Sequence, residues 1–139
     1  MSESTIRDAA CSCGQLRIRV AGEPQIVSSC HCLACQRRTG AVFGSSAFFL
    51  RSQIVSTEGE RQTFRRQGES GAWLNFQFCP TCGSTVFWES ERFADMVSVA
   101  VGVFADPHFP APGRTIWTTT KHDWLAFPPH IPNHLKSST

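Results

Sequence analysis

Seven cysteines in a chain of 139 residues constrain the fold more strongly than any other feature of the sequence. They occur in three short runs, namely C-S-C-G from Cys11, C-H-C-L-A-C from Cys30 and C-P-T-C-G from Cys79. The opening MSESTIRDAA is polar and lacks the apolar segment of a signal peptide, so we expect a cytoplasmic protein with reduced thiols. Since a disulfide framework would also leave one of the seven cysteines unpaired, we interpret them as metal ligands.

The first and last runs predict a structural zinc site made of four thiolates. In an extended C-x-C segment both sulfurs leave the same face of the chain. In the last run Gly83 permits the turn that points two sulfurs at one ion. Two such pairs complete a tetrahedral site on Cys11, Cys13, Cys79 and Cys82. Because the pairs are far apart in the sequence, the zinc would constrain the unfolded chain and stabilise the fold.

The middle run leaves Cys30, Cys32 and Cys35 as a separate group of three. Three protein ligands with an open fourth position are the usual arrangement of a catalytic zinc. Iron–sulfur clusters usually take four cysteines, so the count favours zinc. If the run is extended, the His31 side chain points to the face opposite Cys30 and Cys32, so it is a poor ligand candidate. The alternative is that His31 or a distant histidine, such as His108 or His122, fills the fourth position and makes this site structural as well.

The rest of the sequence predicts an all-β fold. Leu16, Ile18 and Val20 alternate with polar residues, as in a strand with one buried face. Extended runs follow at residues 26–29, 44–50, 63–66, 73–78, 85–89 and 97–104, most of them separated by Gly, Pro or Ser. A short helix is predicted near residues 33–39, ended by Gly40, and the proline-rich tail from residue 107 is predicted to be extended. This length and pattern indicate a single domain over residues 1–139.

Charge and hydropathy exclude two classes of partner from our predictions. The formal charge is +2, and seven thiolates holding two Zn²⁺ would bring the loaded protein close to −1. Such a protein has little electrostatic affinity for phosphates, so we predict no nucleic-acid partner. The longest apolar stretch, at residues 96–105, is too short to cross a bilayer, so we predict no membrane association.

Taken together, the cysteine runs resemble those of the glutathione-dependent formaldehyde-activating enzyme family, whose domain is shared with centromere protein V. All seven cysteine positions match, and the resemblance extends over about residues 11–127. Beyond the cysteines, the family pattern has a basic pair and a Gly-Ala step after the middle run, a Phe before the last run and a closing K-x-x-W. The matching residues are Arg37, Arg38, Gly40, Ala41, Phe78, Lys121 and Trp124.

The resemblance implies an Mss4-like β-tent of stacked antiparallel sheets that is stapled by zinc. It also implies two Zn²⁺ per chain, in the same division that the spacing indicates. The structural ion would be held by residues Cys11, Cys13, Cys79 and Cys82, and the catalytic ion by residues Cys30, Cys32 and Cys35. The family reaction joins formaldehyde to glutathione as S-hydroxymethylglutathione, which is a carbon–sulfur lyase reaction written in reverse.

We therefore predict a zinc-dependent enzyme that adds a small thiol, such as glutathione, to an aldehyde such as formaldehyde. The thiol would become the fourth ligand of the zinc on the group of three cysteines, where it would lose its proton. Arg37 and Arg38 would offset the negative charge of the thiolates or bind a carboxylate of the substrate. The alternative function is a zinc-stabilised binding module without catalytic activity.

Overall fold

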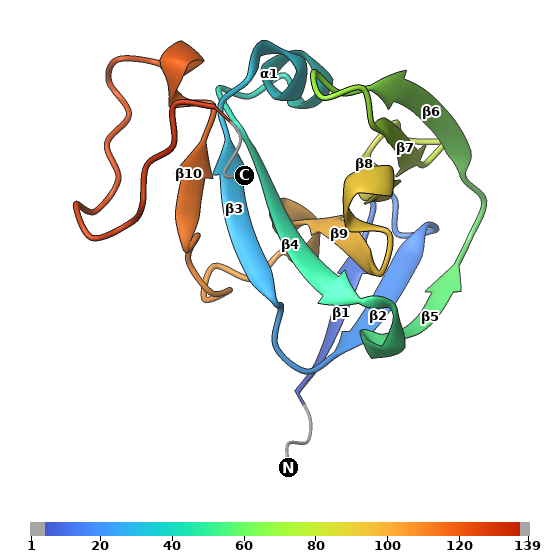
Figure 1. The fold of residues 1–139 in the computed structure, drawn as a ribbon. Coiled ribbons are helices and arrows are strands. Elements are labelled where there is room, and N and C mark those ends of the chain that lie inside the picture. Colours follow the sequence, from blue (N-terminus) through green and yellow to red (C-terminus); the bar gives the residue numbers. More distant parts are fainter. Residues whose placement is uncertain (1–4, 137–139) are drawn as a thin grey trace. The chain divides into compact units, whose positions relative to one another are not determined.

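The computed structural model describes residues 5–136, and most of its regular structure is β-strand (Figure 1). Within this range the strands are β1 (Ile6–Ala10), β2 (Arg17–Ala21), β3 (Ile26–Cys30), β4 (Gly44–Leu50), β5 (Ile54–Glu58), β6 (Gln62–Gln67), β7 (Trp73–Phe78), β8 (Thr85–Ser90), β9 (Met96–Ala100) and β10 (Arg114–Ile116). The described residues also form one α-helix, α1 (Leu33–Thr39), and the 3₁₀ helices η1 (Arg51–Gln53), η2 (Glu91–Phe93), η3 (Val101–Phe104) and η4 (Thr118–Thr120). These elements confirm the predicted all-β class.

The described chain forms two compact units. Unit 1 contains the residues up to Gln25 together with Ala47–Phe109, and unit 2 contains Ile26–Ser46 together with the residues from Pro110 onward. Strand β4 begins in unit 2 and continues into unit 1. The single domain over residues 1–139, whose two ends lie outside the described residues, stays a prediction.

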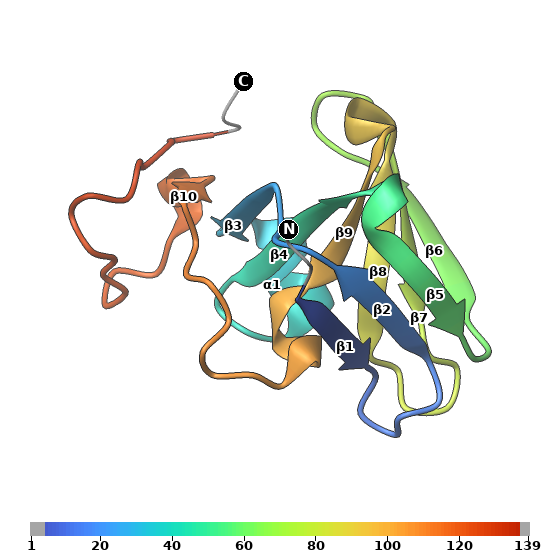
Figure 2. The same ribbon diagram turned by 90° about the horizontal axis from the view of Figure 1, so that it is seen from below.

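Unit 1 contains a three-stranded antiparallel sheet and the antiparallel strands β6, β7, β8 and β9 of a seven-stranded sheet (Figure 2). In one sheet β2 lies between β1 and β5. In the other, β6, β7, β8 and β9 pair in chain order, and β2 packs against β8. Leu16, Ile18 and Val20 are at most 1% exposed, which confirms the buried face that their alternation predicts.

One strand is shorter than the sequence indicates. We expected extended chain over residues 97–104, but β9 ends at Ala100 and the chain continues as η3. This turn buries the Phe104 side chain and stacks its ring on Phe109, with 4.7 Å between the ring centroids. Burial of an aromatic ring therefore outweighs the β propensity of a valine-rich run.

Unit 2 contains β3, α1, the start of β4, β10 and the tail. β3 and β10 pair in parallel, and the tail adds an isolated parallel bridge between Thr115 and Asn133. Helix α1 begins after Cys32 and ends at Gly40, which has a φ of 69°. Glycine enters this left-handed conformation without strain, so the helix ends where the sequence predicts.

Candidate metal centres

The four cysteines of the predicted structural site lie together in unit 1. The sulfurs of Cys11, Cys13, Cys79 and Cys82 are all within 4.8 Å of one another. The Cys13 Sγ lies 3.6 Å from Cys11 Sγ and 3.7 Å from Cys79 Sγ. A tetrahedral zinc with Zn–S bonds of about 2.3 Å places its sulfurs about 3.8 Å apart, so the observed spacings suit one such ion.

Two tight turns hold these sulfurs. In the first, the Gly14 N–H donates to the Cys11 carbonyl over 3.0 Å. In the second, the Gly83 N–H donates to the Cys79 carbonyl over 2.8 Å. Gly14 and Gly83 have φ values of 86° and 80°, which glycine adopts without strain. The glycine that follows each cysteine pair is therefore a local requirement of the turn.

Hydrogen bonds aimed at the sulfurs favour negative charge at Cys79 and Cys82, whereas desolvation and contacts with the other cysteine sulfurs raise the pKa of Cys13 to about 11. The Leu16 N–H donates to Cys11 Sγ over 3.2 Å, and the Thr81 N–H donates to Cys79 Sγ over 3.3 Å. Hydrogen bonds with the side chain and backbone of Ser84 lower the pKa of Cys82 to about 5. These contacts favour the thiolate form, which is the form that binds a metal.

Gln15 connects this group to the turn between β5 and β6, and sequence reasoning missed it. Its Nε2 donates to Cys79 Sγ over 3.0 Å and to the Glu60 carbonyl over 2.7 Å, while its Oε1 accepts from the Glu60 N–H over 2.8 Å. Gly59 passes so close that a Cβ atom there would lie 1.9 Å from the Gln15 carbonyl oxygen. The only sequence signal was the position of Gln15, directly after the first cysteine run.

The remaining three cysteines lie together in unit 2. Cys30 is the last residue of β3, Cys32 caps α1, and Cys35 lies in its first turn. Their sulfurs are within 4.8 Å of one another, and no histidine, carboxylate or fourth cysteine of residues 5–136 joins the group. Hydrogen bonding with the sulfurs of Cys32 and Cys35, together with burial, raises the pKa of Cys30. A cation bound among the three sulfurs would reverse this effect.

His31 lies between two of these cysteines but does not belong to their group. Its side chain is fully buried and packs against Phe43 and Phe127, with ring centroids 5.2 Å and 5.4 Å away. Its Nε2 lies 3.3 Å from the Ser29 hydroxyl, and burial lowers the pKa of the imidazole. His31 thus anchors the cysteine run in the core of unit 2.

The His31 carbonyl is held by two side chains that the sequence did not single out. Gln36 Nε2 donates to it over 2.9 Å, and Thr120 Oγ1 donates to it over 2.7 Å. The same Gln36 nitrogen donates to the Thr120 carbonyl over 3.0 Å, and its Oε1 lies 3.1 Å from His122 Nε2. His122, named above as an example of a distant ligand, therefore contacts Gln36.

The structure separates the two arginines that the sequence placed together. Arg37 is exposed, whereas Arg38 is half-buried. A Cβ atom built on Gly44 would lie 3.0 Å from a terminal nitrogen of Arg38 and 3.7 Å from Cys35 Sγ. Arg38 and Cys35 therefore border the same small space over Gly44, and Arg38 is the arginine that can influence charge at the three sulfurs.

Two comparisons found similarity to known proteins, one to a family model and one to a solved structure. A family model described as glutathione-dependent formaldehyde-activating enzyme matches residues 6–120, well over half of the chain. A crystal structure of a Rhodobacter sphaeroides protein superposes with a TM-score of 0.50 at 20% identity, covering 69% of this chain and 85% of that one. This likeness concerns the fold alone. No curated protein matches, and no helix within residues 5–136 is long and apolar enough to span a membrane.

Proposed function

Because the chain belongs to the glutathione-dependent formaldehyde-activating enzyme family, we propose that it is a zinc-dependent enzyme of the carbon–sulfur lyase type that adds a small thiol to an aldehyde such as formaldehyde. The observation that carries this proposal is the group of three sulfurs on Cys30, Cys32 and Cys35, which no further ligand residue of the described chain joins. Three ligands with an open position suit a catalytic metal.

The donor sets of both groups fit Zn²⁺. Thiolates are soft ligands that favour this ion, and four sulfurs at tetrahedral spacing suit a closed structural site. We assign Cys11, Cys13, Cys79 and Cys82 to that structural ion. At the three-sulfur group, the chemistry that Zn²⁺ supplies when bound is to lower the pKa of an added thiol. Since free cysteines persist in a reducing compartment, we place the protein in the cytoplasm.

The residues of the chain around this group have separable roles in the proposed reaction. Cys30, Cys32 and Cys35 bring three negative charges as thiolates, and Arg38 beside Cys35 offsets part of that charge. We also assign to Arg38 the binding of a carboxylate of a glutathione-like thiol. In the reaction, the sulfur of the substrate thiolate forms a bond to the aldehyde carbon. The carbonyl electron pair moves to oxygen, and the resulting alkoxide takes a proton from solvent. Arg37 is exposed and contributes less. The absence of a nucleic-acid partner stays a prediction.

Cobalt substitution tests whether a thiol binds at the open position. Thiolate-to-cobalt absorption increases with each sulfur ligand, so glutathione should raise this band in the wild type. S-methylglutathione, which carries no thiol, is the matched ligand control, and Cys32→Ala should not respond to either compound. Exchange NMR with formaldehyde and glutathione then measures whether the protein accelerates adduct formation. A cobalt spectrum that no thiol changes would favour a binding module, and a thiol response without acceleration would reject formaldehyde as the substrate.

A further inference from the structure

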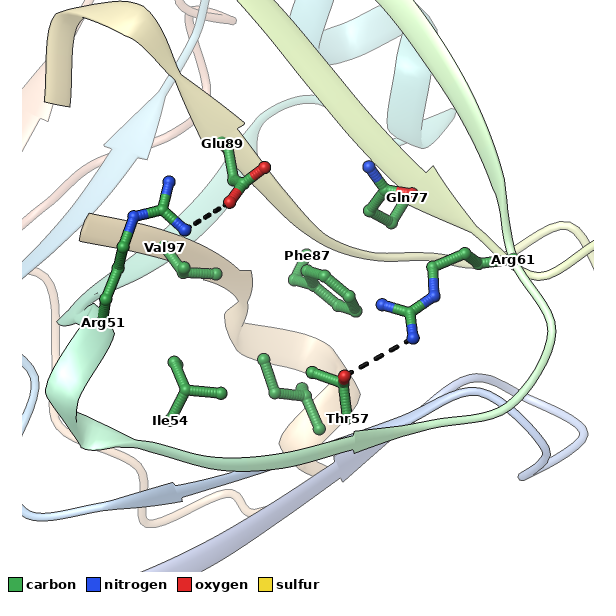
Figure 3. A pocket seen from close by; sticks show the side chains of 9 residues that line it. Arg51, Ile54, Thr57, Arg61, Gln77, Phe87, Glu89 and Val97 are labelled. Carbon is green, nitrogen blue, oxygen red and sulfur yellow. Dashed lines mark hydrogen bonds and ion pairs between the residues drawn. The ribbon is translucent and has the colours of Figure 1, made fainter. Parts of the chain in front are cut away.

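Unit 1 contains a cavity that the proposed metal chemistry does not use (Figure 3). Its volume is about 330 Å³. The residues that line it come from both sheets of unit 1 and from η1 and the β5–β6 turn, and none of them is a cysteine; the ones used below are Ile18, Arg51, Thr57, Arg61, Phe87 and Glu89.

The floor of the cavity is apolar and preformed by strand pairing. Ile18 and Phe87 are 1% and 6% exposed, so their positions are held by the core. Ile18 lies opposite Thr57 in the β2–β5 ladder, and Phe87 lies opposite Gln77 in the β7–β8 ladder. Each pair therefore places one apolar and one polar side chain at the cavity. The apolar surface would contact the body of a ligand, and the polar groups would orient it.

One of the two arginines at the rim is already neutralised. The Arg51 guanidinium forms an ion pair with Glu89, and its Nε donates to the Ala94 carbonyl over 2.8 Å (Figure 3). These partners hold Arg51 and Glu89 together on one side of the cavity. Their charges cancel, so this side offers polarity without net charge.

The second arginine, Arg61, has no carboxylate partner among residues 5–136. Its guanidinium lies over the Phe87 ring, 5.4 Å from the centroid, and donates one long hydrogen bond of 3.4 Å to Thr57 Oγ1. Figure 3 shows it on the side of the cavity away from the Arg51–Glu89 pair. A guanidinium has five N–H donors, so most of the donors of Arg61 are available to a ligand. The lining residues together carry one net positive charge.

We propose that this cavity binds a small monocarboxylic acid with an apolar or aromatic body. The carboxylate would accept a bidentate hydrogen bond from Arg61, and the body would pack against Ile54, the half-buried apolar residue of the lining. A volume of about 330 Å³ lies at the small end of the range for ligand pockets, which favours a small ligand. A dianion would bring a second charge toward Glu89, and a neutral ligand would leave Arg61 without a counter-charge.

The Gln77 amide supports an orientation in which the carboxylate of the ligand lies at Arg61. Its Oε1 accepts a hydrogen bond from the Thr63 hydroxyl over 2.9 Å, so the amide oxygen is already used. The Nε2 group is then left to donate, and it adds a second donor to the wall that carries Arg61. The wall therefore presents donors to an anion, over an apolar floor.

Titration with phenylacetate, followed by carbon–proton NMR of the isoleucine methyl groups, tests this site. Phenylacetate should shift the Ile18 and Ile54 methyl signals, which line the cavity, while the Ile116 and Ile131 signals in unit 2 stay unchanged. Phenylacetamide, which has the same shape without the charge, should bind at least tenfold more weakly. The measurement needs no thiol or aldehyde, so its outcome is independent of the proposed enzyme activity.

Two arginine variants separate this site from general attraction of anions. Arg61→Gln should weaken phenylacetate binding about 10- to 100-fold, because it removes a hydrogen bond to a charged group. Arg65→Gln is the control, since Arg65 lies on β6 with its guanidinium over Trp73 and does not line the cavity. No shift of the Ile18 and Ile54 signals at 20 mM phenylacetate would overturn the proposal. Equal binding of the acid and the amide, or equal weakening by the two variants, would overturn it as well.

Discussion

Replacing Gln15 with methionine should destabilise the four-cysteine group while preserving the volume of the side chain. The change removes the hydrogen bond to Cys79 Sγ and the pair of hydrogen bonds to the Glu60 backbone. Cys79 is fully buried, and a hydrogen bond to a charged group contributes about 1.5–3 kcal/mol. Glu60 is exposed, so water replaces its two partners at a smaller cost. The expected total is about 2–4 kcal/mol.

This loss has two measurable consequences. For a chain of this size, each kcal/mol lowers Tm by roughly 3 °C, so Gln15→Met should lower it by about 6–12 °C. A group that orients metal ligands is typically worth about 10–100-fold in metal affinity, which competition with a chromophoric chelator would measure. Gln25→Met is the matched control, because Gln25 is exposed and, within residues 5–136, its Nε2 donates only to Gln53 Oε1, over 3.2 Å. Equal Tm and equal zinc affinity in the two variants would refute the assigned role of Gln15.

Three further predictions follow from the division of the cysteines and arginines. Elemental analysis should find close to two zinc ions per chain, and at most one after reconstitution with zinc would contradict the two-site arrangement. Cys82→Ala should cause misfolding or a large loss of Tm, because it opens the closed four-sulfur site. Cys32→Ala should lose only the second metal and the activity. Equal destabilisation by the two variants would make both sites structural. Arg38→Gln should raise KM for glutathione about tenfold or more, because Arg38 rather than Arg37 borders Cys35. Arg37→Gln should change KM less than twofold. Equal effects of the two variants in steady-state kinetics would reject separate roles for the two arginines.

The spacing of the cysteines anticipated which ligands meet in space. Cys11 and Cys79 are buried and adjacent, although they lie 68 positions apart in the sequence. This grouping was predictable because C-x-C and C-x2-C-G are local geometries that point two sulfurs one way, and two such pairs complete one tetrahedron. The identity of the ions as zinc and the catalytic role of the three-sulfur group stay predictions.

Strands without a strong local pattern were not predictable. β1, β5 and β10 were missed because their apolar residues are few or are interrupted by charges, and only pairing with neighbouring strands holds them extended. The opposite error occurred at residues 101–104, where a β-prone sequence turns to bury Phe104.

The sequence by itself determined the all-β class, the helix that ends at Gly40 and the separation of the cysteines into four and three. These features depend on residue type and short spacing, which act before the chain folds. Only the tertiary structure decided that Arg38 rather than Arg37 borders Cys35, that Gln15 reaches Cys79, and that Arg61 lines a cavity without a carboxylate partner among residues 5–136. The contacts of Gln15 and Arg61 depend on side chains from segments that are remote in sequence. The contact of Arg38 depends on the direction in which one of two adjacent side chains points. Packing sets both, and no local pattern encodes either.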